Sequence, residues 1–129
     1  MRLYSAALLA VMAGPTLEAS STSSSPVTMT GWFSDERCAT RSVKAGYISP
    51  NNPQCVTRCL SQGATPVFIS EQAKALFVVI GHPTVKDDVG WHVQITGTVG
   101  PTGKSIEVSA VKRMAFVGAS CALRKRPSP

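Results

Sequence analysis

Long apolar runs, charged residues and known catalytic motifs are all scarce in this 129-residue chain. No apolar run approaches the roughly 18 residues of a membrane-spanning helix, which argues against an integral membrane protein. The sequence has no Gly-x-Ser-x-Gly and no His-Glu-x-x-His, and its two histidines cannot be placed in a Ser/His/Asp set. We therefore expect a protein that is not an enzyme and holds no cofactor.

Cysteine and net charge are also limited. The chain has 4 cysteines, which is few for a scaffold held mainly by disulfides, and 16% of its residues are charged. The net charge is +6, and half of it lies in Arg124-Lys125-Arg126. Short basic tails of this kind are usually solvated. We expect a monomer, and we do not expect a nucleic acid as partner, because the central strands are apolar and an exported protein seldom meets nucleic acid.

The first 19 residues have the pattern of a secretory signal. Arg2 supplies a positive charge, an apolar stretch runs from Leu3 to Ala13, and Ala13 and Ala19 are candidate cleavage points. The alternative is an N-terminal helix of a cytoplasmic protein. We expect a periplasmic or secreted protein divided into a signal peptide (1–19), a Ser/Thr-rich linker (20–26), one folded domain (27–117) and a basic tail (118–129).

Alternation of apolar and polar residues predicts most of the strands. Val27–Phe33 and Trp91–Val99 alternate clearly, and Lys104–Met114 is expected to pair back after a turn at 100–103, with Ile106, Val108 and Ala110 facing inward. Gly97 within a strand indicates a bulge or tight bend, which a small closed barrel requires.

The middle of the chain predicts a hairpin and little helix. Val67–Ile69 and Leu76–Ile80 are expected to form a hairpin buried on both faces. Asn52-Pro53 begins a short helix that ends at Gly63, and one helical turn follows Thr84. We expect 34–51 to be irregular. The fold class is therefore all-β with short helices (β-rich α+β), a small five-stranded OB-fold-like barrel.

Several of these segments together resemble one group of secreted bacterial OB-fold domains. In that group a Gly-aromatic strand runs into a cysteine, as in Gly31-Trp32-Phe33 and Cys38, and a Cys-x-x-x-Cys helix and a Pro-Val-Phe strand follow, as in Cys55, Cys59 and 66–68. A V-x-V-x-G-x-V-like hairpin closes the domain. The group has no established activity, so the resemblance implies a fold and a compartment but no function.

The cysteine spacing predicts disulfides. Cys55 and Cys59 lie at i and i+4 of the expected helix, about 6 Å apart at Cβ, which is too far for a bond between them. Each therefore needs another partner or stays free, and an oxidising compartment favours the disulfide. We expect Cys38 to pair with Cys55 or Cys59 and Cys121 to pair with the other.

A metal or redox site is the main alternative for the same thiols. Two thiols at i and i+4 can bind one ion, with Cys38 and either His82 or His92 completing the set. This alternative would make Cys38, Cys55, Cys59 and His92 ligands rather than structural links. The spacing lacks the Cys-x-x-Cys pairs typical of structural zinc sites.

The strand faces indicate a candidate ligand surface. His92, Gln94 and Thr96 share the polar face of one strand, and Trp32 lies on the polar face of another. These four residues are the expected ligand-binding site for a small polar ligand or another envelope component. The alternative for Trp32 is packing beneath the 53–62 helix. A second alternative function is nucleic-acid binding, with Trp32 as a stacking platform.

Overall fold

The computed structural model describes residue 14 and residues 24–116, so the expected signal peptide, the basic tail and Cys121 lie outside the described residues. The order of elements confirms a β-rich α+β domain. It is β1 (Val27–Asp35), α1 (Glu36–Lys44), α2 (Pro53–Ser61), β2 (Pro66–Ser70), β3 (Ala75–Ile80), α3 (Val85–Asp88), β4 (Trp91–Val99) and β5 (Ser105–Phe116). No helix in the described part is long and apolar enough to cross a membrane.

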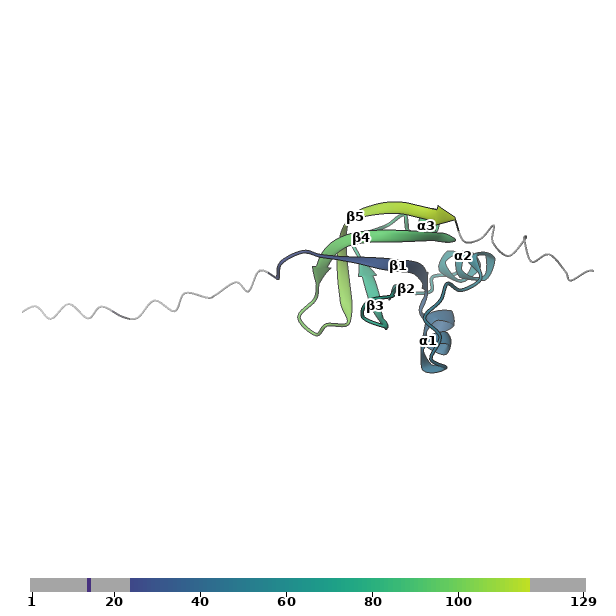
Figure 1. The fold of residues 1–129 in the computed structure, drawn as a ribbon, viewed down its shortest axis with the longest axis horizontal. Helices are drawn as coiled ribbons and strands as arrows, with labels where there is room; N and C mark the ends of the chain where they lie inside the picture. The colour runs from purple at the N-terminus through teal and green to yellow at the C-terminus, as the bar shows by residue number, and fades with distance from the viewer. Residues whose placement is uncertain (1–13, 15–23, 117–129) are drawn as a thin grey trace, which may run out of the picture.

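The five strands form one mixed sheet that closes in a ring (Figure 1). β1 pairs with both β2 and β4, β2 pairs with β3, and β4 pairs with β5, all antiparallel. A short parallel pairing of β3 with β5 completes the circuit. The expected five strands are therefore confirmed, and each edge of the sheet is paired with another strand.

The interior of the ring follows the predicted alternation. Met29 and Phe33 of β1 face inward, together with fully buried Phe68, Ile95 and Ile106 from three other strands. Val56 of α2 is fully buried in the same cluster, where Leu60 also packs, so α2 closes one end of the ring. The expected start of this helix is confirmed, since Asn52 caps it and Pro53 occupies its first turn.

The predicted bulge at Gly97 is confirmed, and it corrects the expected orientation of β5. The register with β5 shifts between Thr96 and Gly97, so that Thr96 pairs with Ala110 and Gly97 with Val108. The extra residue reverses the inward alternation, and Ala110 is exposed although it was expected to face inward. The hairpin prediction also needs correction, because Val78 and Ile80 of β3 are exposed on its outer face.

The expectation of an irregular segment over 34–51 is wrong, because α1 lies within it. Asp35 caps the helix, Glu36 lies in its first turn, and Arg41 and Lys44 lie in its last turn, which is the charge order that the helix dipole favours. These start and stop signals are present in the sequence. The high charge of the segment obscured them.

Helix α1 covers the outside of the ring rather than its end. Ala39 is fully buried against Val67 and Ile69 of β2, and Trp32 packs against this second cluster. Trp32 therefore packs against the cluster to which α1 contributes Ala39, whereas the packing alternative placed it beneath the 53–62 helix. Figure 1 shows α1 and α2 adjacent to each other at the end of β1.

Gly31 is expected to be essential for the pairing of β1 with β2, because a Cβ there would lie 1.8 Å from the Ile69 carbonyl oxygen. We predict that Gly31→Ala lowers the free energy of unfolding by about 3 kcal/mol. Gly46→Ala is the control: its Cβ meets nothing within 4 Å, although φ is +83°, and it is expected to lower the same free energy by about 1 kcal/mol. Urea unfolding followed by tryptophan fluorescence measures both, and equal losses would contradict the close strand approach.

Candidate functional site

Asp35 joins β1 to α1 and is the centre of the candidate site. Its Oδ1 accepts hydrogen bonds from the backbone N–H groups of Arg37 and Cys38, both at 3.1 Å, which caps the helix. The residue is fully buried. Its other carboxylate oxygen, Oδ2, is buried without a hydrogen-bond partner among the described residues, and buried polar atoms are seldom left in this state.

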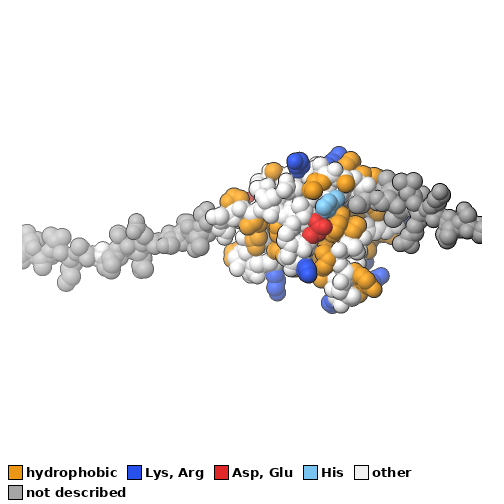
Figure 2. Space-filling model, in the orientation of Figure 1, with side chains coloured by type: hydrophobic (Ala, Val, Ile, Leu, Met, Phe, Trp, Pro, Cys, Tyr) orange, Lys and Arg blue, Asp and Glu red, His pale blue; other side chains and the backbone are white. Residues whose placement is uncertain are grey.

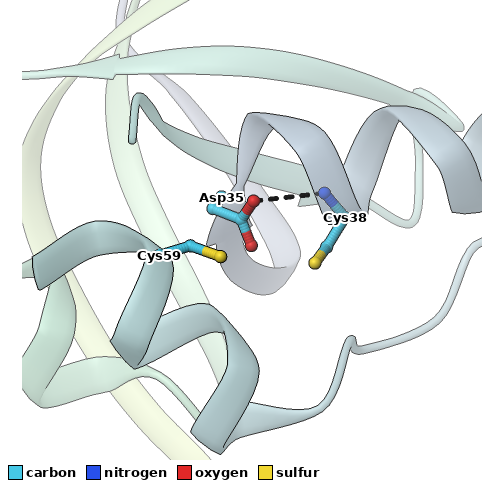
Figure 3. Close-up of side chains that lie close together, drawn as sticks. All are labelled: Asp35, Cys38 and Cys59. Carbon is cyan, nitrogen blue, oxygen red and sulfur yellow. Dashed lines mark hydrogen bonds between the residues drawn. The ribbon is translucent and has the colours of Figure 1, made fainter. Parts of the chain in front are cut away.

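Two thiols face this carboxylate. One ligand atom each from Asp35, Cys38 of α1 and Cys59 of α2 lie within 4.8 Å of one another. Figure 3 shows both sulfur atoms and the carboxylate directed into the same space between the two helices. We call these three residues the thiol–carboxylate site. Cys38 and Cys59 are both partly exposed, so the site opens to solvent.

Backbone and side-chain bonds hold the two helices in this arrangement. Asp35 pairs with Pro66 at the end of the β1–β2 register, and the N–H of Glu36 donates to the carbonyl of Thr65 at 3.0 Å. Between the helices, Asn51 accepts from the hydroxyl of Ser34 at 2.6 Å and donates to that of Ser42 at 2.7 Å. The site is thus anchored to the ring on one side and to the α1–α2 loop on the other.

The environment of Cys38 favours the neutral thiol. Burial raises the pKa of Cys38 most. A side-chain hydrogen bond with Asp35, the charge of Asp35 and the thiols of Cys59 and Cys55 raise it further, from 9.0 to about 11. Each of these causes disfavours the thiolate, through desolvation, through a hydrogen bond that needs the thiol proton, or through negative charge. A positive ion placed between these groups would offset the negative charge and would therefore stabilise the thiolate of Cys38.

The three cysteines of the described chain all carry free thiols. Cys55 and Cys59 occupy i and i+4 of α2 and are not bonded to each other, as expected. The closeness of Cys38 and Cys59 agrees with one of the two pairings expected for Cys38. That disulfide stays a prediction, and the pairing of Cys121 lies outside the described residues.

The expected ligand surface forms a hydrogen-bonded network across β1 and β4, which we call the polar strip. His92 Nε2 lies 2.6 Å from Glu71 Oε2, and the Thr30 hydroxyl donates to the same oxygen at 2.6 Å. Gln72 closes the network with two bonds to Thr30, at 2.6 and 3.0 Å. The His92 ring stacks obliquely on Trp32, with centroids 5.1 Å apart.

Of the four predicted ligand residues, the structure brings Trp32 and His92 into contact. Thr96 shares a 3.3 Å hydrogen bond with Thr28, and Gln94 stands opposite Thr30 in the strand register. Nε2 of His92 and the hydroxyl of Thr96 each have a hydrogen-bond partner within the protein, whereas Nε1 of Trp32 is buried without a partner in the described part of the chain. The strip therefore fixes the β2–β3 turn onto β1 and β4.

Burial acts to raise the pKa of Glu71, but the hydrogen bonds from Thr30 and His92 and the charge of His92 outweigh it, so the pKa lies below its ordinary value. Glu71 and Gln72 were missed from the sequence because they lie in a turn. Strand faces alone do not indicate turn residues that fold back onto a neighbouring strand.

A third polar group lies in a cleft of about 570 Å³ between the β3–β4 connection and β5. Buried Asp88 accepts from Arg113 Nε and contacts His82 Nε2, both at 2.8 Å. Arg113 also donates to the carbonyl of Asp87 and lies 5.2 Å over the Trp91 ring. These bonds join α3 to β5, and the histidines His82 and His92 are both engaged away from the thiol–carboxylate site.

Comparison with known proteins gives no further guidance: no family model, no curated protein and no solved structure matches the chain.

The raised pKa of Cys38 predicts a distinctive alkylation profile. Because only the thiolate reacts, the rate at Cys38 should rise with pH up to about pH 11. Asp35→Asn keeps a helix cap but removes one negative charge, so it should shift the midpoint to lower pH. Iodoacetamide labelling with peptide mapping measures this, and an unchanged midpoint in the variant would show that Asp35 does not act on the thiol.

The lowered pKa of Glu71 predicts an acid-sensitive contribution to stability. A carboxyl group with a depressed pKa in the folded state stabilises the fold above its unfolded value, and this contribution disappears as the pH falls through the folded value. Denaturation midpoints between pH 7 and pH 3 should therefore fall more steeply in the wild type than in Glu71→Gln. Parallel curves for the two proteins would refute the role of Glu71 in the network.

Proposed function

We propose that this protein is an exported OB-fold domain. It binds a thiophilic divalent metal ion such as zinc through Asp35, Cys38 and Cys59. One observation carries the proposal: a fully buried carboxylate presents an oxygen with no partner among the described residues to two nearby thiols. These three residues lie at the junction of three elements whose positions the ring determines.

A cation explains the unpaired oxygen better than a disulfide does. A buried carboxylate without a full set of partners is costly, by roughly 1–3 kcal/mol or more for each unsatisfied group. A disulfide between Cys38 and Cys59 would consume both thiol groups, and Oδ2 of Asp35 would still have no partner. An ion bound to all three residues would instead satisfy the oxygen and neutralise the charges that oppose ionisation of Cys38.

The donor set indicates the class of ion. Two sulfur ligands and one carboxylate oxygen suit zinc and related thiophilic ions. Calcium and magnesium prefer sets made entirely of oxygen. Three protein ligands leave one position of a tetrahedral ion open to water or to a further ligand.

The strand arrangement supports the OB-fold part of the proposal. A five-stranded Greek-key sheet that closes on itself is the defining feature of that fold, and the circuit β1-β2-β3-β5-β4 has this form.

OB folds bind oligonucleotides on the face of strands 2 and 3. Here α1 covers β2 through Ala39, and on the face shown in Figure 2 charged side chains are few and of both signs. Nucleic-acid binding is therefore not favoured.

Export rests on the sequence of residues 1–19, with its charged start and apolar stretch. In a periplasmic or secreted protein, free thiols are exposed to oxidation. A bound ion would hold Cys38 and Cys59 as thiolates. The ligand proposed here is therefore the ion, in place of the small polar ligand expected at Trp32, His92, Gln94 and Thr96.

The full-length protein, purified under reducing conditions, is expected to bind one equivalent of zinc. Cobalt should bind at the same place and produce a thiolate-to-metal charge-transfer absorption. Cys38→Ser and Cys59→Ser should each weaken zinc binding by about 100-fold or more, and Asp35→Asn by about tenfold or more. Competition with a chromophoric chelator measures the affinities, and cobalt absorption reports the sulfur ligands.

His92→Gln is the matched control, since His92 belongs to the polar strip and not to the site. It should leave zinc affinity unchanged, whereas a loss equal to that of Cys38→Ser would place the ion elsewhere. Circular dichroism verifies that each variant is folded. Protein that binds no zinc when reduced, and whose native mass is lower by two hydrogens through a Cys38–Cys59 disulfide, would refute the proposal.

A further inference from the structure

Cys55 is a third thiol beside the thiol–carboxylate site that the proposed ligand set does not use. It lies one helical turn before Cys59 on α2, and residues at i and i+4 of a helix are neighbours on one face, about 5–6 Å apart at Cβ. Cys55 is exposed, whereas Cys38 and Cys59 are only partly exposed. The thiols therefore form a series from solvent to the buried carboxylate.

The series is anchored at both ends. At the inner end, Asp35 is fully buried and directs its unpartnered Oδ2 toward Cys38 and Cys59. At the outer end, the backbone N–H of Cys55 donates to the Asn52 cap at 3.2 Å, which fixes the residue in the first turn of α2.

We propose that Cys55 is the transfer thiol of the site, through which the metal ion is exchanged with an acceptor that binds it by thiolates. This inference rests on the proposed metal site. A purely structural site has no need of an exposed third thiol, whereas exchange between two carriers proceeds most readily through shared ligands. The partner is thus a thiol-bearing metal carrier and not a carboxylate chelator.

The transfer is a series of ligand substitutions with no change in oxidation state. The Cys55 thiol loses its proton to solvent and forms a bond to the ion as the bond to Cys59 breaks, and Cys59 takes up a proton. A first acceptor thiolate would then replace water at the open position of the ion. Further acceptor thiolates or water would replace Cys38, Asp35 and Cys55 in turn, with the two cysteines taking up protons as they leave, so that each step makes one metal–ligand bond and breaks one.

The test compares zinc transfer from the loaded full-length protein to two acceptors, a small dithiol and an aminocarboxylate chelator. Cys55→Ser should keep one equivalent of zinc with affinity close to that of the wild type. Its transfer to the dithiol should be slower by about tenfold or more, and its transfer to the aminocarboxylate should be unchanged. Stopped-flow mixing with a zinc indicator measures both rates.

A relocated thiol is the matched control. Thr57 is exposed on the same helix, two residues from Cys55 and therefore on another face. The double variant Cys55→Ser/Thr57→Cys restores the number of thiols and should still transfer slowly to the dithiol. Fast transfer in this variant would show that any surface thiol suffices, and the assignment of Cys55 would be wrong.

The remaining outcomes separate this inference from the proposed function. Zinc binding in Cys55→Ser with an unchanged dithiol rate would overturn the transfer role and leave the metal site standing. Loss of zinc binding in Cys55→Ser would make Cys55 a primary ligand, which also overturns the transfer role. Absence of zinc binding in the wild type would refute the metal site itself.

Discussion

The buried carboxylate of Asp35 is the constraint on which the candidate chemistry depends. One of its oxygens ends β1 and begins α1 by capping the helix, and this cap leaves the other oxygen directed at Cys38 and Cys59. The two roles use different atoms of one side chain. An amide could perform the first role as well, so the cap does not require a negative charge. In the proposed metal site, that charge would serve the ion.

The closed ring of strands provides the rigidity that such a site requires. Gly31 lets β1 approach β2 so closely that no side chain fits between them, and the bulge at Gly97 bends β4 along β5. β1 therefore enters α1 at a fixed place, and α2 is fixed by Val56 in the interior. Ligands on two helices keep their geometry only when both helices are tied to the same core.

The polar strip and the thiol–carboxylate site differ in one physical respect. In the strip, Glu71 receives hydrogen bonds from Thr30 and His92, so its charge is already stabilised within the protein. At the thiol–carboxylate site one buried carboxylate oxygen has no partner among the described residues. Burial, a hydrogen bond with Asp35 and the charge of Asp35 raise the pKa of the neighbouring Cys38 thiol. A satisfied network stabilises a fold, whereas an unpartnered buried carboxylate beside two thiols favours a cation.

The sequence by itself determined the five strands, the start of α2 and the position of the bulge, because alternation, caps and glycines act over a few neighbouring residues. It also carried the cap signals of α1, which its high charge obscured. Only the tertiary structure decided that Asp35 joins Cys38 and Cys59 while His92 pairs with Glu71. The same holds for Ala110, which the bulge turns outward. Such contacts depend on how distant segments pack around a closed ring, and no local periodicity encodes that distance.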